Sequence, residues 1–196
     1  MLSAAILVGG RARRLDGIAK PLLTVGDRSI LTRQLAALRF AGIERIVLVG
    51  RWRAEVAVCG SSVADAIEGG SLGALYTALL VATTDPVIVV AGDMPFITAA
   101  LVRRLTVVPP ECDAVVPQDA NGWHPLCACY RRSIAMRLKA RIDRGESSVR
   151  DALGDLTVGV VDAAELARID PDGMMLMNVN ASADYERAQR AAQTHA

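Results

Sequence analysis

The sequence predicts an α/β protein with a mostly parallel central sheet whose second half is mixed. Short apolar runs that end near glycine or aspartate alternate with longer segments of helical periodicity. This alternation is typical of βαβ units, in which parallel strands are buried on both faces. One strong turn signal, Asp119-Ala120-Asn121-Gly122, separates two apolar runs and indicates a hairpin, so part of the sheet should be antiparallel.

The first half of the chain contains three predicted strands and three predicted helices. The strands are the apolar runs 2–8, 45–49 and 87–90. The helices are expected at 30–39, with Ser29 as N-cap and Gly42 as the stop, at 72–82, and at 99–105, with Thr98 as N-cap. Residues 51–62 show no legible pattern.

The second half should add four strands and three helices. The strands are expected at 114–116, 126–130, 158–161 and 175–177, with the turn signal between the first two. The helices are expected at 134–142, at 148–153, and from Ser182 into a polar tail.

The composition excludes several classes of protein. Apolar residues make up 52 % of the 196 residues and charged residues 22 %, which excludes a disordered chain. The formal net charge of +1 gives no field that would draw the protein to nucleic acid or to an anionic membrane, so neither is expected as a partner. We expect a single domain over residues 1–196, because a core of this size is stable without staples.

Three further features predict a cytoplasmic protein. The arginines follow the apolar run 2–8 rather than precede it, which is not the order of a signal peptide. The charge-free run between Glu68 and Asp85 is shorter than the roughly 20 residues of a membrane helix. Four cysteines do not make a disulfide framework in a chain this long. Cys127 and Cys129 are predicted to be small core residues on one face of a strand rather than zinc ligands.

Glycines and cations follow the first predicted strand. Gly9 and Gly10 permit a close approach of the backbone to a ligand. Four cations come within the next ten residues: Arg11, Arg13, Arg14 and Lys20. This density suits a polyphosphate, and a solvated basic loop is the alternative. Neither the P-loop pattern nor the dinucleotide pattern G-x-G-x-x-G is present.

A single aspartate follows the most apolar predicted strand. Asp93 stands directly after 87–90 and Gly92, and ligands of open parallel sheets bind outside the carboxyl ends of the strands. Mg²⁺ takes one or two carboxylates together with phosphate oxygens. The alternative is a cap for the next helix, for which Thr98 is better placed. Asp93 is therefore predicted as a magnesium ligand.

Three other segments are candidate ligand contacts. The glycine-rich segment 69–73 precedes a predicted helix, where free N–H groups could meet an anion or a base edge, or where the chain could make a plain tight turn. His124 has no acidic or thiol partner beside it and is interpreted as structural or substrate-contacting. Asn178 and Asn180 end an apolar run, where their amides could bind a ligand or a metal, or serve as a helix cap in competition with Ser182.

Five motifs in order resemble the MobA-like nucleotidyltransferases, over nearly the whole chain. They are Leu7-Val8-Gly9-Gly10 through Lys20, Gly92-Asp93-Met94-Pro95-Phe96, His124-Pro125-Leu126 with Tyr130, Gly145-Glu146-Ser147-Ser148-Val149, and Met177-Asn178-Val179-Asn180 with Asp184. The first is similar to the family pattern L-A-G-G-x-x-x-R-M-G-x-x-K and the last to N-x-N-T-P-E-D-L. The resemblance implies a Rossmann-like three-layer α/β sandwich with a mostly parallel, mixed central sheet.

The resemblance also implies an activity and its residues. It implies transfer of GMP from GTP to the phosphate of molybdopterin, with release of pyrophosphate and with Mg²⁺ as cofactor. The implied nucleotide contacts are the backbone of Leu7, Val8 and Gly9 for the base, Asp65 for the base or ribose, and Gly10, Arg14 and Lys20 for the triphosphate. The implied catalytic residues are Lys20, Arg14 and Asp93, with Asp93 as metal ligand. The implied acceptor contacts are His124, Asn178 and Asn180.

Departures from the family pattern leave the base and the acceptor open. Asp16 places a negative charge in the phosphate loop, and Ala19 stands where guanylyltransferases often have aspartate. Gly70-Ser71-Leu72 is similar to the cytidylyltransferase pattern G-x-S-L, whereas 178–180 favours guanine. The alternatives are a cytidylyltransferase, a transferase acting on a sugar or polyol phosphate, and a non-catalytic nucleotide-binding regulator. A guanylyltransferase would pass its product to molybdoenzymes or their chaperones.

Overall fold

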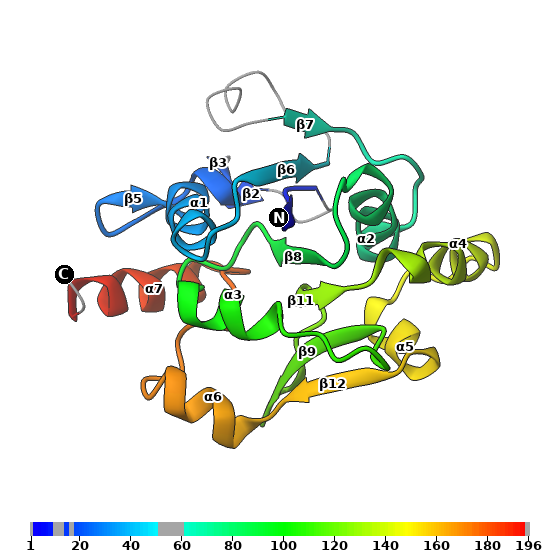
Figure 1. The fold of residues 1–196 in the computed structure, drawn as a ribbon. Helices are drawn as coiled ribbons and strands as arrows, with labels where there is room; N and C mark the ends of the chain where they lie inside the picture. Colours follow the sequence, from blue (N-terminus) through cyan, green and yellow to red (C-terminus); the bar gives the residue numbers. More distant parts are fainter. Residues whose placement is uncertain (1, 10–13, 16–17, 51–60, 195–196) are drawn as a thin grey trace.

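The centre of the computed structural model is a mixed eight-stranded sheet (Figure 1). The structure describes residues 2–9, 14–15, 18–50 and 61–194, with the backbone alone at 14, 15, 18 and 194. The strands are β1 Ser3–Leu7, β6 Arg45–Val49, β7 Ser61–Val63, β8 Val87–Ala91, β9 Ala114–Asp119, β10 Gly122–Trp123, β11 Cys127–Tyr130 and β12 Val158–Val161. Their order is β10-β9-β11-β8-β1-β6-β7, and β12 also pairs with β9.

The strand directions confirm a mostly parallel half and a mixed half. β1 lies parallel to both β6 and β8, and β6 lies parallel to β7. β11 runs antiparallel to β8 and β9, while β12 is parallel to β9. The predicted turn is also confirmed, with Asp119 paired to Gly122 across it. That turn joins β9 to the short strand β10, and the longer strand β11 pairs with the start of β9.

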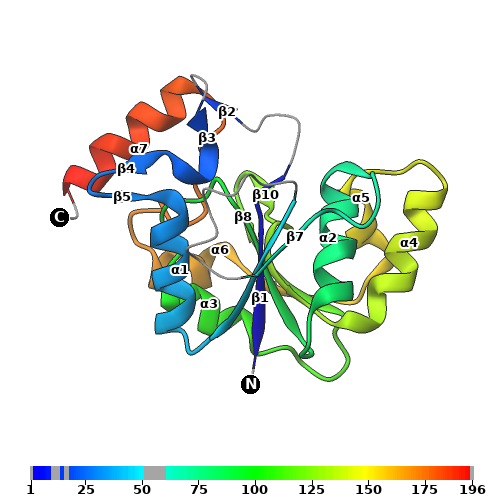
Figure 2. The same ribbon diagram turned by 90° about the horizontal axis from the view of Figure 1, so that it is seen from above.

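Helices cover both faces of the sheet, which confirms the three-layer sandwich (Figure 2). On one face lie α1 Ile30–Phe40, α3 Ala99–Leu105 and α6 Ala163–Ile169, and on the other lie α2 Gly70–Val81, α4 Ala135–Asp143 and α5 Val149–Ala152. Each face has its own core, built mainly from aliphatic side chains. Cys127 and Cys129 are both buried in the core beneath α1 and α3, as predicted.

Local capping explains where the predicted helices begin. The Ser29 hydroxyl accepts a hydrogen bond from Thr32 N–H at 3.1 Å, and Thr98 does the same for Leu101 at 3.2 Å. These bonds satisfy N–H groups that have no partner inside the helix. At the end of α1, Gly42 has φ +87°, a left-handed conformation that ends the helix. All three cap positions were predicted from the sequence.

The strand expected at 175–177 is absent, and that prediction is wrong. Met175 and Leu176 are buried, which explains the apolar pattern. Their backbone instead makes turns, because Met175 N–H donates to the side chain of Asp170 and Met177 N–H donates to the Met174 carbonyl. Buried apolar side chains were therefore mistaken for a strand. Helix α6 and the short strand β7 were not predicted.

The last helix packs beside the chain that follows β1. This helix, α7 Ser182–Thr194, lies next to the small hairpin of β4 Thr24–Val25 and β5 Arg28–Ser29 (Figure 2). A third core forms there, in which Val25, Val179 and Ala188 are buried. Just before the hairpin come the paired strands β2 Arg14–Leu15 and β3 Ile18–Ala19 and the 3-10 turn η1 Lys20–Leu22. This packing brings residues near 20 and 180 together.

No helix in the described ranges is both long and apolar enough to cross a membrane.

Candidate active site

A pocket of about 730 Å³ opens at the carboxyl ends of the central parallel strands. Ligands of open α/β sheets bind at this edge, and the volume lies within the usual range of small-molecule sites. The lining residues come from the ends of β1 and β8, from η1, from the start of α2 and from the segment before α7. They are Leu7, Val8, Gly9, Lys20, Pro21, Asp65, Ile67, Glu68, Gly69, Gly70, Ser71, Ala74, Ala91, Gly92, Asp93, Leu126 and Asn180.

Glycine allows the strand ends to meet closely at the floor of the pocket. Gly50, after β6, has φ +132°, and a Cβ atom there would lie 2.5 Å from Gly9 N. Gly92, after β8, donates its N–H to the Leu7 carbonyl at 2.9 Å, and a Cβ atom there would lie 3.0 Å from that oxygen. Any larger residue would push β1 away from its neighbours. The backbone at Leu7–Gly9 is therefore held at the pocket floor.

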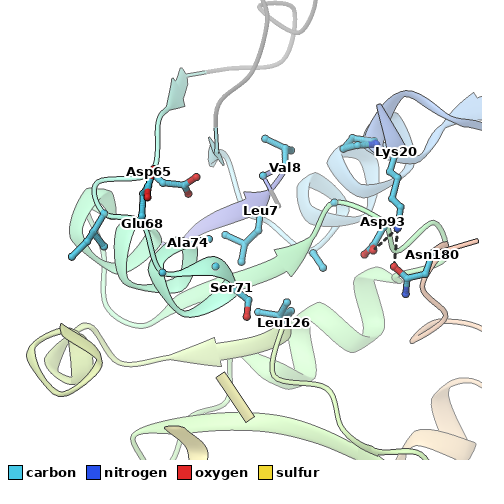
Figure 3. A pocket seen from close by; sticks show the side chains of 17 residues that line it. Leu7, Val8, Lys20, Asp65, Glu68, Ser71, Ala74, Asp93, Leu126 and Asn180 are labelled. Atoms are coloured by element: carbon cyan, nitrogen blue, oxygen red, sulfur yellow. Dashed lines mark hydrogen bonds and ion pairs between the residues drawn. The ribbon is translucent and has the colours of Figure 1, made fainter. Parts of the chain in front are cut away.

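Lys20, Asp93 and Asn180 converge at one end of the pocket (Figure 3). Lys20 Nζ donates a hydrogen bond to Asn180 Oδ1 at 2.8 Å and lies 3.8 Å from Asp93 Oδ2. Lys20 is 5 % exposed, so its ammonium is held in one place rather than spread through solvent. These residues are far apart in the sequence, and the structure brings together the cation, the carboxylate and one amide that the motifs singled out.

The Asp93 carboxylate is well suited to a hard metal ion. Its Oδ1 atom is buried, and no other residue in the described part of the chain hydrogen-bonds to it. Burial raises the pKa of Asp93 above its ordinary value, and the positive charge of Lys20 opposes that rise. Burial of a carboxylate oxygen without a hydrogen bond is unfavourable, and a bound cation would offset that cost. Mg²⁺ fits this position, because it takes one or two carboxylates and completes its shell with phosphate oxygens and water.

The described residues do not form a complete protein cage for a metal. Within the described ranges, no three His, Cys, Asp or Glu side chains gather closely enough to hold an ion. A metal at Asp93 would therefore need ligands beyond these described side chains, which the phosphate oxygens of a bound substrate could supply. That requirement is typical of Mg²⁺ in nucleotide enzymes, where the ion enters with the phosphates.

Gln34 fixes the loop that carries Asp93. Its side chain is completely buried on α1, and Nε2 donates to the carbonyls of Ala91 at 2.7 Å and Met94 at 3.0 Å. From the other side, Val179 N–H donates to the Asp93 carbonyl at 2.8 Å. Gln34 was not predicted as a site residue from the sequence. Its signal was a polar residue within the apolar stripe of the predicted helix 30–39.

Gln34→Leu should lower the free energy of unfolding by about 1–3 kcal/mol, because two buried carbonyls would lose their donor. Urea denaturation at pH 7 measures this change. Gln193→Leu, the same substitution at an exposed position of α7, is the control and should stay within about 0.5 kcal/mol of the wild type. If Gln34→Leu is as stable as its control, Gln34 does not support the Asp93 loop.

The other end of the pocket combines carboxylates with the start of α2. Asp65 and Glu68 lie there, on the far side from Lys20 (Figure 3). Gly69, Gly70 and Ser71 continue the wall into α2, and the Ser71 hydroxyl donates to the Ser147 carbonyl at 3.3 Å. The predicted contact Asp65 therefore lies in the pocket. Glu68 was not singled out from the sequence, which gave no signal to separate it from a solvated glutamate.

Of the predicted site residues whose side chains the structure describes, His124 and Asn178 are not among those that line this pocket. Gly10 lies outside the described residues, and so does the side chain of Arg14. His124 Nε2 lies 3.0 Å from Asp119 Oδ1, at the β9–β10 turn. The Asn178 amide donates to the Leu176 carbonyl at 3.5 Å. His124 was expected to have no acidic partner, but it lies beside an aspartate across the turn.

The charges that line the pocket limit which ligands can bind there. Among the lining residues named above, Asp65, Glu68 and Asp93 are acidic, and Lys20 alone is basic. A polyphosphate could not bind such a surface without further positive charge, because like charges at short range repel strongly. A divalent cation at Asp93 would supply it, and the arginines between Gly9 and Lys20 stand nearby in the sequence.

A mixed sheet with a pocket at this edge, in which Lys20 and Asp93 stand beside a glycine-lined backbone floor, is typical of an α/β nucleotidyltransferase. The model of the MobA-like NTP transferase domain matches residues 4–158, and the chain belongs to this family. Asn180 and α7 lie beyond the matched segment.

One relative supports the family assignment, and two solved structures support the fold. A relative from Chloroflexus aggregans, named as a probable molybdenum cofactor guanylyltransferase, is 31 % identical and covers 96 % of this chain and 94 % of its own length. The structure of molybdopterin-guanine dinucleotide biosynthesis protein A from Archaeoglobus fulgidus is 23 % identical, with a TM-score of 0.79, and covers 98 % of this chain and 100 % of its own. A Mycobacterium tuberculosis protein solved in complex with manganese is 22 % identical, with a TM-score of 0.69 over 96 % of this chain and 97 % of its own. The two structures support the fold.

Proposed function

We propose that this protein transfers GMP from GTP to the phosphate of molybdopterin and releases pyrophosphate, as a molybdenum cofactor guanylyltransferase. The observation that carries the proposal is the Lys20–Asp93–Asn180 cluster at one end of a pocket whose floor is backbone. A nucleotide needs both features. Its phosphates need charged side chains at one end of the pocket, and its base needs a surface of fitting shape, which the backbone floor offers. The names of full-length relatives supply the nucleotide and the acceptor.

The two ends of the pocket are lined by different residues, and we propose that each end binds a different part of the nucleotide. The triphosphate is proposed to lie against Lys20, with Gly10 and Arg14 as further contacts from the preceding loop. The base is proposed to lie over Leu7, Val8 and Gly9, with Asp65 on the base or ribose. Val8 N–H already donates to the Val49 carbonyl at 2.8 Å, so a base would meet the Val8 carbonyl rather than its N–H.

The reaction requires little covalent help from side chains. The acceptor phosphate is already an anionic nucleophile, so its oxygen can attack the α-phosphorus of GTP without a general base. The bond from that phosphorus to the bridging oxygen breaks, and pyrophosphate leaves with the electron pair. Catalysis then rests on alignment and on charge stabilisation. Lys20, fixed by Asn180, is placed to stabilise the charge that develops on the leaving group, with Arg14 in support.

Asp93 is the proposed magnesium ligand. Asp93 would hold the Mg²⁺ ion, which would supply positive charge against the negative charge that grows on the phosphates. The buried, bare Oδ1 of Asp93 and the acidic lining of the pocket both favour this assignment.

The acceptor is proposed to contact His124, Asn178 and Asn180. Asn180 lines the pocket beside Lys20, and Leu126, two residues after His124, lines it from the β11 side. We further propose that the chain acts as a single cytoplasmic domain and hands its product to molybdoenzymes or their chaperones. Nucleic acid and membrane have no part in this proposal.

GTP with Mg²⁺ should raise the melting temperature by several degrees, whereas CTP, ATP and UTP should not. A ligand present at a hundred times its Kd stabilises the folded state by roughly 2.7 kcal/mol, which for a domain of this size shifts Tm by several degrees. Thermal unfolding with each nucleotide at millimolar concentration measures this. Pyrophosphate release with GTP and molybdopterin is the matching activity assay.

A shift with CTP instead of GTP would contradict the guanylyltransferase proposal. Gly70 and Ser71 line the pocket, and with Leu72 they are similar to a cytidylyltransferase pattern. That observation makes a cytidylyltransferase the second candidate. The nucleotide that shifts Tm therefore decides between the two.

A further inference from the structure

Asp184 accepts hydrogen bonds from the backbone next to the Lys20 ammonium, at Asn180, whose side chain contacts that ammonium. Its Oδ2 atom accepts hydrogen bonds from the N–H groups of Asn180 and Ala181, both at 2.9 Å. Asp184 lies in the first turn of α7, and an acidic side chain there can reach back to the N–H groups that precede a helix. These two bonds lower the pKa of Asp184, so its carboxylate stays ionised and keeps both of them at neutral pH.

The contacts continue from Asp184 into the pocket. Asn180 is exposed, and its Oδ1 atom accepts the hydrogen bond from the buried Lys20 ammonium. The neighbouring Val179 is completely buried, and its N–H donates to the Asp93 carbonyl. Asp184 itself does not line the pocket. A carboxylate outside the pocket is thus hydrogen-bonded to a segment that contacts both Lys20 and the Asp93 loop.

We propose that Asp184 is a positioning residue, which fixes the backbone at Asn180 so that the Asn180 amide holds the Lys20 ammonium beside Asp93. Its consequence for turnover rests on the proposed function, but its consequence for Lys20 does not. Because an exposed asparagine has many side-chain conformations, an anchored backbone restricts the positions of its amide. Helix α7, beyond the segment that defines the family, would then complete the phosphate end of the pocket.

A merely structural role is the competing explanation. The same two hydrogen bonds stabilise the start of α7, and their loss would loosen the helix whether or not Lys20 moves. Gln189 provides the matched control. It fastens α7 through Nε2 to the Thr24 carbonyl at 2.7 Å and through Oε1 to Gly26 N–H at 3.0 Å, and neither bond reaches Asn180. Gln189→Ala should weaken α7 without releasing Asn180.

Lysine reactivity tests the proposal directly. Lys20 and Lys139 are the two lysines of the chain, and Lys139, with 32 % of its side chain exposed, is an internal reference. An amine-acylating reagent followed by mass spectrometry gives the ratio of their modification rates in the intact protein. Asp184→Ala should raise the Lys20 to Lys139 ratio severalfold. Asp184→Asn should leave it near the wild-type value, because the amide oxygen can still accept both N–H groups. Gln189→Ala should not change it.

Turnover gives the second readout. Asp184→Ala should lower kcat for GTP by roughly tenfold to a hundredfold, since small displacements of a catalytic group have effects of that size, with a smaller change in KM. Asp184→Asn should recover most of the loss. An unchanged lysine ratio in Asp184→Ala, or equal ratios in Asp184→Ala and Gln189→Ala, would overturn the proposal. A wild-type protein that does not use GTP would contradict the proposed function and leave the lysine result standing.

Discussion

Asp93→Asn should reduce kcat by roughly a thousandfold, because a catalytic metal ion contributes several kcal/mol to the transition state. The substitution keeps the shape of the side chain and removes the charge that would hold a divalent ion. Pyrophosphate release with GTP, molybdopterin and Mg²⁺ at saturating concentrations measures the effect. Raising the Mg²⁺ concentration should recover little of the rate, because an amide is a poor substitute for a buried carboxylate.

The same variant should fold at least as well as the wild type. Because burial raises the pKa of Asp93, with Lys20 opposing, the folded chain binds a proton there more readily than the unfolded chain. The stability that this proton provides is present below the ordinary pKa of aspartate and is lost as the pH rises through the raised value. At pH 7 the wild type buries a charge that Asp93→Asn does not, so Tm without ligands should be equal or higher in the variant.

Asp151→Asn is the control for loss of one negative charge. Asp151 is exposed on α5 and does not line the pocket, so its variant should keep wild-type turnover. The metal role of Asp93 is wrong if Asp93→Asn retains more than about a tenth of the rate, since an ion worth several kcal/mol cannot be lost so cheaply.

The parts of the fold that could be predicted depend on local signals. Ser29 and Thr98 are caps because their hydroxyls reach N–H groups three residues on, and that relation is visible in sequence. The buried parallel strands β1, β6 and β8 are continuous apolar runs, which is the pattern of strands covered on both faces.

The parts that were missed depend on long-range packing. Met175 and Leu176 fill the core beside α3 and α6, and Met177 packs against the core beside α7, so nothing local distinguishes this apolar segment from a strand. The strands β4 and β5 have two residues each, which is too short for any periodicity. They exist because α7 packs against them from the far end of the chain.

In the candidate site too, the predicted residues carry local signals, and the missed ones depend on long-range contacts. Lys20, Asp93 and Asn180 were predicted because each stands at the end of an apolar run or within a family motif. Gln34 was missed because its partners lie 57 and 60 residues away, and a buried glutamine has no sequence signature beyond its place on an apolar stripe. Asp184 was part of a motif, but its role depends on hydrogen bonds to Asn180 and Ala181 whose geometry cannot be inferred from the sequence.

Lys20→Met should lower kcat by about a hundredfold or more, the usual effect of removing one donor that stabilises charge in a transition state. Methionine keeps the length of the buried stem and removes the ammonium. KM for GTP should rise as well, because Lys20 faces the phosphates in the ground state too. Steady-state kinetics at several GTP concentrations separates the two effects. Lys139→Met, at a half-buried position on α4 away from the pocket, is the control and should keep wild-type kinetics.

The pH profile of Lys20→Met distinguishes a transition-state role from simple binding. The positive charge of Lys20 lowers the pKa of Asp93, so its removal lets burial raise that pKa further. The acidic limb of the kcat/KM profile should therefore move to higher pH in Lys20→Met, and part of the loss near that limb should be recovered at higher pH. The remaining loss, independent of pH, is the direct contribution of the ammonium to the leaving group. An unchanged kcat with a raised KM would reduce Lys20 to a contact of the bound nucleotide.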